Sequence, residues 1–139
     1  MTTDTTQTAP RSLPASADVV GGGVLALLGL LHLFGLGLGG VVGFLALLVG
    51  WPLIAGVVAG RLSVDATDRS VNGAVAGVFG SLTVTLLVLL TGLVGAWPAF
   101  ITSNIGVTLW SVTLAVLAML TISWTVFGYA GGFLADTLA

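Results

Sequence analysis

The chain contains no cysteine, lysine or glutamate, and only eight of its 139 residues are charged. Without cysteine it cannot form disulfides, thiolate metal sites or thiol nucleophiles. With three cations, all of them arginine, it has no basic patch for the phosphates of nucleic acid. Charged residues make up 6% of the sequence, against about 25% in an ordinary soluble domain. The chain therefore lacks the side chains for a water-facing surface.

Hydrophobic residues make up 57% of the sequence and form two long uncharged segments, 19–60 and 71–135. An uncharged apolar run of about 18 residues or more is typical of a membrane-spanning helix. One helix over 19–60 would be about 63 Å long, twice the hydrocarbon core of about 30 Å, so each segment is expected to turn back on itself. The sequence thus predicts an all-α fold, an integral membrane four-helix bundle of two glycine-rich helical hairpins.

Glycine and proline indicate where the two segments turn. In the first segment we expect the turn at residues 35–40, because glycine tolerates the dihedrals of a tight turn. A turn at residues 50–52 is the alternative; otherwise Pro52 lies inside a helix and should kink it. In the second segment the turn is expected at residues 95–104, which contain a Trp-Pro pair. The resulting helices are predicted near 19–36, 41–61, 70–94 and 105–133.

Four spans place every charged side chain on the same side of the membrane. The loop 61–70 holds four of them, and the others lie near the two ends of the chain. Because arginine is retained on the cytoplasmic side, both termini are predicted to be cytoplasmic, in a multi-pass protein of the cell membrane. Residues 1–17, rich in Thr, Ser and Pro, are predicted to be a flexible cytoplasmic tail, and 18–139 the membrane domain. The charged residues are Asp4, Arg11, Asp18, Arg61, Asp65, Asp68, Arg69 and Asp136.

The charges of the loop are also placed to stabilise the ends of the flanking helices. Arg61 is expected at the negative end of the preceding helix, and Asp65 and Asp68 at the positive end of the following one. Asp68 or Ser70 is expected to cap that helix, and Asp65 would pair with Arg69 if the stretch is helical. A docking or regulatory loop is the alternative interpretation.

Glycines spaced four residues apart are expected to hold the helices together, because helices in lipid associate where small residues let their backbones approach. The pairs Gly56/Gly60 and Gly73/Gly77 lie on either side of the charged loop and are predicted to face each other. The expected packing residues are Gly56, Gly60, Gly73, Gly77, Gly80, Gly128 and Gly132.

The helix predicted at 105–133 carries small side chains along one face. We expect this face to pack against the other three helices; a pore wall or a dimer face is the alternative, because hydroxyl groups can also line water. The opposite face, with Trp110, Leu114, Leu117 and Trp124, is expected to face lipid. The small face consists of Thr108, Ser111, Ala115, Ala118, Thr121, Thr125, Gly128 and Gly132.

His32 is the one imidazole of the chain and lies inside the first predicted helix. A single histidine cannot form a zinc site, which needs about four ligands. We expect a buried, neutral side chain bonded to a hydroxyl of the helix at 105–133 or to a backbone carbonyl; an axial haem ligand or a proton relay is the functional alternative. With no carboxylate in mid-span there is no candidate pair for acid and base catalysis, so we expect neither an enzyme nor a cofactor.

Three glycine-rich segments, WPLIAGVVAGRL (51–62), NGAVAGVFGSL (72–82) and FGYAGGFLADTL (127–138), form a set together with the charged loop. In position and glycine spacing they resemble a family of uncharacterised small four-helix membrane proteins common in haloarchaea. The resemblance implies the four-helix architecture and no catalytic residue. The chain departs from the family in its longer Thr-rich tail and in Trp51.

These patterns together predict a small multi-pass protein of the lipid bilayer that self-associates and works as a non-enzymatic packing or assembly partner. The alternative is a channel or transporter for a small solute or ion, lined by the hydroxyls of the helix at 105–133. The two hypotheses differ in whether water reaches the face that bears these hydroxyls.

Overall fold

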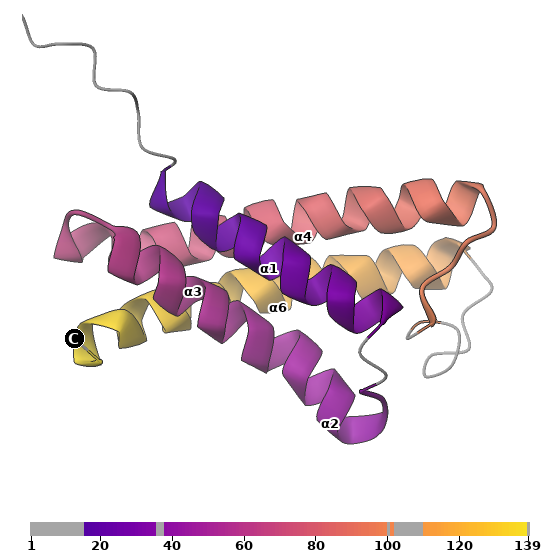
Figure 1. Ribbon diagram of the computed structural model, residues 1–139, viewed down its shortest axis with the longest axis horizontal. Helices are drawn as coiled ribbons and strands as arrows, with labels where there is room; N and C mark the ends of the chain where they lie inside the picture. Colours follow the sequence, from indigo (N-terminus) through magenta and orange to yellow (C-terminus); the bar gives the residue numbers. More distant parts are fainter. Residues whose placement is uncertain (1–15, 36–37, 100, 102–109, 139) are drawn as a thin grey trace, which may run out of the picture.

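The computed structural model describes residues 16–35, 38–99, 101 and 110–138, with the backbone alone described at 110–112. This part of the chain consists of helices and turns, without a strand, which confirms the predicted all-α four-helix bundle (Figure 1). α2, the π-helical turn η1 and α3 follow one another without a break and form one span. The elements are α1 (Ala17–Phe34), α2 (Gly40–Leu45), η1 (Ala46–Gly50), α3 (Trp51–Leu62), the short η2 (Ala66–Asp68), α4 (Arg69–Leu93) and α6 (Trp110–Thr137).

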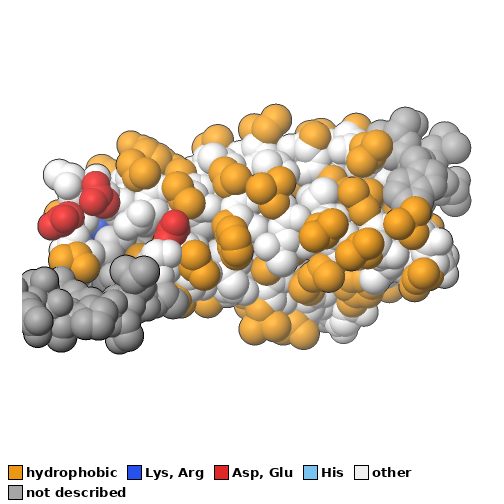
Figure 2. Space-filling model, turned by 90° about the horizontal axis from the view of Figure 1, so that it is seen from above, with side chains coloured by type: hydrophobic (Ala, Val, Ile, Leu, Met, Phe, Trp, Pro, Cys, Tyr) orange, Lys and Arg blue, Asp and Glu red, His pale blue; other side chains and the backbone are white. Residues whose placement is uncertain are grey.

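Four helices in this part of the chain are long and apolar enough to cross a membrane, which indicates a multi-pass membrane protein. Their outer faces carry large apolar side chains such as Leu27, Leu82 and Ile122, each more than half exposed. Figure 2 shows apolar side chains along the length of the bundle and charged side chains at one end. Such a surface is suited to the hydrocarbon core of a bilayer.

The first hairpin turns within the glycine-rich stretch that predicted it. α1 ends at Phe34 and α2 begins at Gly40, whose φ of 62° is one that glycine adopts readily. Residues 50–52 are helical, so the alternative turn at that point is wrong. The second hairpin begins to turn at Gly95, with φ of 77°, and residues 102–109 lie outside the described part.

The other helix bounds follow the prediction closely, with one clear difference at the end of the chain; the start predicted at residue 105 for the last helix lies outside the described residues. The helix predicted to end at residue 133 is α6, which continues to Thr137. Of the predicted tail, residues 1–15 lie outside the described part, and α1 already begins at Ala17. The longer α6 brings its last turn level with the charged loop, where it takes part in the contacts reported below.

α3 and α4 each pack against both α1 and α6 (Figure 1). The buried positions of α6 recur at intervals of three and four residues and include Leu117 and Trp124, which are 2% and 0% exposed. The expectation that these two side chains face lipid is therefore wrong, and Ala115 and Ala118, expected inside, are exposed. The Trp124 ring fits in the interior because Gly29 of α1 leaves room for its far edge.

The packing glycines bring backbones together, but in different pairs from those predicted. Gly56 of α3 and Gly73 of α4 both face Gly128 of α6, and a Cβ at either position would overlap the Gly128 carbonyl oxygen. The predicted contact between the pair Gly56/Gly60 and the pair Gly73/Gly77 is wrong, because the glycines of both pairs face α6. In addition, Gly60 faces Gly132 and Ala135, Gly77 faces Trp124 and Thr125, Gly132 faces Arg69 and Ser70, and Gly80 faces Leu25 of α1.

Candidate functional site

The π-helical turn η1 lies immediately before Pro52, the proline predicted to kink this helix. In this turn the backbone N–H of Trp51 donates to the carbonyl of Ala46, five residues back, and not to Leu47. Pro52 has no N–H, so it cannot donate to the carbonyl of Leu48. Two consecutive carbonyls, those of Leu47 and Leu48, thus lose their usual helical donors inside a membrane span.

Two neighbouring side chains of α6 donate to these carbonyls. The indole Nε1 of Trp124 lies 2.7 Å from the oxygen of Leu47, and Oγ of Ser123 lies 2.7 Å from the oxygen of Leu48. An unsatisfied carbonyl in the hydrocarbon region costs several kcal/mol, so a π-helical turn persists there because another helix provides donors. Such turns are rare and are often found at functional sites.

A third hydrogen bond joins the same region to α1. Nε1 of Trp51 donates to Nδ1 of His32 at 3.0 Å, and the two rings meet edge to face. An indole can only donate, so Nδ1 of His32 is unprotonated and the neutral imidazole carries its proton on Nε2. His32 is buried, and an indole was not among the partners expected from the sequence. We call His32, Trp51, Ser123 and Trp124 the polar centre.

The hydrogen bonds of the polar centre join two side chains of α6 to the carbonyls of η1, and one side chain of α3 to His32 of α1. A haem or metal ligand needs a ring nitrogen with a free lone pair; in His32 the lone pair of Nδ1 is taken by Trp51 and Nε2 carries the proton. Among the described residues, no three His, Cys, Asp or Glu side chains could together hold a metal ion. These hydrogen bonds link α1, α3 and α6 at the point where Pro52 weakens the second span.

The hydroxyls predicted to form a pore wall or packing stripe bond to their own helix where they are described. Oγ1 of Thr121 donates to Leu117 and Oγ1 of Thr125 to Thr121, at 3.0 and 2.7 Å. Thr108 lies outside the described residues, and of Ser111 only the backbone is described. The hydroxyl of Ser123, by contrast, reaches another helix. The sequence offered no signal for it, because its acceptor is released by the distant Pro52.

Ser123→Ala is expected to lower the free energy of unfolding by about 1 kcal/mol, because it removes the donor to the Leu48 carbonyl. In a Pro52→Ala background the backbone N–H of residue 52 can bond to that carbonyl, so the same Ser123 substitution should cost less. The check is denaturant unfolding of the four variants in one mild detergent. Equal costs of the serine substitution in both backgrounds would contradict this account of η1.

The second candidate region is the charged end of the bundle, where the charged loop meets the last turn of α6 (Figure 2). Arg69 forms an ion pair with Asp136, and Nη2 of Arg61 donates to the carbonyl of Leu138 at 2.8 Å. The predicted pairing of Asp65 with Arg69 is wrong, because the Arg69 side chain is directed at α6. The two arginines thus connect the charged loop to the end of α6.

The capping prediction for the charged loop is also wrong. Asp68 occupies the N-cap position of α4, but its carboxylate makes no cap hydrogen bond, and the same holds for Asp65 before η2. Ser70 lies inside the first turn of α4. Both carboxylates are exposed and lie beside the positive end of α4, where their charge is favourable without a direct bond.

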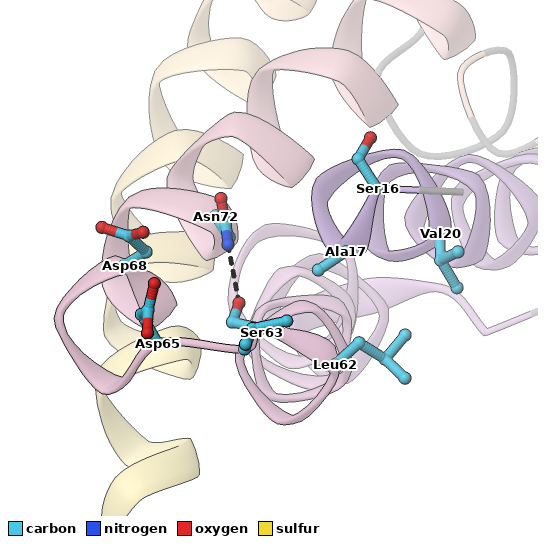
Figure 3. Close-up of a pocket in the computed structure, with 9 residues that line it drawn as sticks. Ser16, Ala17, Val20, Leu62, Ser63, Asp65, Asp68 and Asn72 are labelled. Atoms are coloured by element: carbon cyan, nitrogen blue, oxygen red, sulfur yellow. Dashed lines mark hydrogen bonds between the residues drawn. The ribbon is translucent and has the colours of Figure 1, made fainter. Parts of the chain in front are cut away.

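A cavity of about 550 Å³ opens at this end of the bundle, and we call it the end cavity (Figure 3). Asn72 donates to Oγ of Ser63 at 2.7 Å, and Ser63 in turn donates to the carbonyl of Ala59, so these polar groups are fixed in the cavity wall. Sequence analysis did not single out Ser63 or Asn72, since neither belongs to a recognisable spacing. The lining residues are Ser16, Ala17, Val20, Leu62, Ser63, Val64, Asp65, Asp68 and Asn72.

Comparison of the chain with protein-family models, with curated proteins and with solved structures found no match.

Proposed function

We propose that the chain is a multi-pass protein of the cell membrane that acts without catalysis, as a packing or assembly partner within the bilayer, with both termini in the cytoplasm. The observation that carries the proposal is the way the described interior is filled. The glycines of α3 and α4 lie against the backbone of α6, and the Trp124 ring occupies the middle of the bundle. The polar centre uses its donors to satisfy the chain's own carbonyls and its own histidine.

The proposed orientation is supported by the charged end. Arg61 and Arg69 lie together there, and arginine near the end of a span is retained on the cytoplasmic side. Self-association is supported by the outer face of α6, where exposed Ala115 and Ala118 would let a helix of a second copy approach closely. Membership of the haloarchaeal family that the glycine-rich segments resemble is part of the same proposal.

Single cysteines test the proposal cleanly, because the chain has none of its own. In intact cells, a membrane-impermeant maleimide should react with Val94→Cys at the uncharged end, and with Thr137→Cys only after permeabilisation. Thr121→Cys should stay unreacted in both conditions. Reaction at Thr137 in intact cells would contradict the orientation, and reaction at Thr121 would favour a water-filled path and hence the channel alternative.

The same Thr137→Cys label measures self-association. Fluorophore bleaching steps, counted in discs of native lipid cut from the membrane, should show more than one copy per disc. A population of single copies at native expression would be evidence against self-association.

A further inference from the structure

The second membrane span has two parts that are held differently. Among the described residues, α3 packs against α1, α4 and α6, and its glycines bring its backbone close to that of α6. α2 packs mainly against η1 of its own span, and Figure 1 shows it standing apart from α6. Phe44 of α2 packs against the interior, whereas Val41, Val42 and Leu45 are each more than half exposed. The part of the span after η1 is therefore held firmly and the part before it loosely.

η1 separates these two parts, and its backbone is weakly bonded along its own helix. In an unbroken helix each carbonyl accepts from the N–H four residues on, so bending strains a row of backbone hydrogen bonds. The carbonyls of Leu47 and Leu48 lack this donor and accept from the side chains of Trp124 and Ser123. A side-chain donor can follow its acceptor by rotating about its own single bonds. A change of angle at η1 therefore breaks fewer backbone hydrogen bonds than one elsewhere in the span.

The residues on either side of Trp51 are poor helix formers. Trp51 itself is anchored, because its Nε1 donates to Nδ1 of His32 on α1. Packing does not require glycine at Gly50, because a Cβ there would meet no side chain or neighbouring helix within 4 Å. Inside a helix, glycine is about 1 kcal/mol less favourable than alanine, and proline is less favourable still. Gly50 and Pro52 thus weaken the helix at the point where the loosely held part begins.

We infer that α2 moves as a unit about η1 while α3 stays packed in the bundle. The hinge consists of a few residues at the junction of two helical segments, which absorb the change in backbone angle. The movement changes the distance between α2 and α6 at the uncharged end and leaves the charged end as it is. The uncharged end of the bundle therefore adopts more than one width, which packing alone does not need.

Distances between pairs of spin labels test the inference, since the chain has no cysteine of its own. One label is placed on α6 at an exposed residue, Val126→Cys, and the second at exposed residues of three other helices: Val42→Cys on α2, Ile54→Cys on α3 or Leu31→Cys on α1. In lipid discs, pulsed electron paramagnetic resonance should give a wide distribution of distances for the α2 pair and narrow ones for the α3 and α1 pairs. Equal widths for the three pairs would overturn the inference.

Two substitutions test whether the movement takes place at η1. Pro52→Ala restores an N–H for the carbonyl of Leu48, and Gly50→Ala favours the helix without a clash. Each should narrow the distribution of the α2 pair to the width found for the α3 pair. If the distribution stayed wide in both variants, the spread would come from fraying of α2 itself, and the hinge would be refuted.

A third substitution should act in the opposite direction. Ser123→Ala removes the donor of α6 that holds the carbonyl of Leu48, so it should widen the distribution of the α2 pair. Gly23→Ala in α1 is the matched control for Gly50→Ala, because a Cβ at Gly23 also meets nothing within 4 Å. It should leave all three distributions unchanged. A narrowing with Gly23→Ala equal to that with Gly50→Ala would contradict a hinge at η1.

Discussion

Trp124→Ala is expected to destabilise the bundle strongly, by about 3–5 kcal/mol. The Trp124 ring is fully buried, and its far edge lies against Gly29 of α1. Its Nε1 donates to the carbonyl of Leu47 in η1, and its backbone carbonyl faces Gly77 of α4. One residue of α6 therefore contacts each of the other three spans, and its removal leaves a cavity among all of them.

The measurement is thermal aggregation or denaturant unfolding in one mild detergent. Tyr129→Ala is the matched control, because Tyr129 is an aromatic residue of the same helix that is half exposed; it should change stability little. Trp124→Phe separates the two roles of the ring, since it keeps most of the volume and loses the donor to Leu47. It should cost about 1–3 kcal/mol. If Trp124→Ala behaved like Tyr129→Ala, the interior position of Trp124 would be wrong.

Gly77→Ile is expected to have the next largest effect, because it drives α4 and α6 apart. A Cβ at Gly77 would overlap the carbonyl of Trp124, and that carbonyl is part of a helix and cannot move away alone. Overpacking of an interior typically costs about 1–3 kcal/mol, and two rigid backbones place this site at the upper end. Lower stability in detergent, measured as for Trp124, is the expected outcome.

Val78→Ile is the control for this substitution. Val78 is the next residue of α4 and is 37% exposed, so an added methyl group there can extend into lipid. The control variant should match the unchanged protein. Should Gly77→Ile match it too, the glycine face of α4 would not lie against α6.

The long uncharged segments of the sequence predicted the spans, and glycine and proline predicted the turns between them. They did not predict which face of each helix lies inside. Lipid is as apolar as leucine, so the hydrophobic pattern does not separate an inner face from an outer one. Trp124 illustrates the error: a large ring suits lipid by its chemistry, but it lies inside because a glycine on another helix makes room for it.

The partners of Gly77 and the form of the break at Pro52 could not be predicted for a related reason. Glycine spacing predicts a close contact between helices but does not identify the partner helix. In this bundle the glycines of both α3 and α4 lie against α6. Proline predicts a weakened helix, but the π-helical turn before Pro52 depends on donors at Ser123 and Trp124 on α6. Both features belong to the assembled bundle.

The helices of the bundle differ greatly in length, and this difference sets how the protein meets its bilayer. α1 has 18 residues and α6 has 28, which correspond to about 27 Å and about 42 Å of helix. A hydrocarbon core of about 30 Å is therefore slightly thicker than α1 is long, whereas α6 must tilt or extend into the headgroups. Hydrophobic mismatch thus acts in opposite senses on two helices of one chain. A thicker bilayer would strain α1 first. The lipid chain length would therefore affect the contacts that α1 makes with α3 and α4.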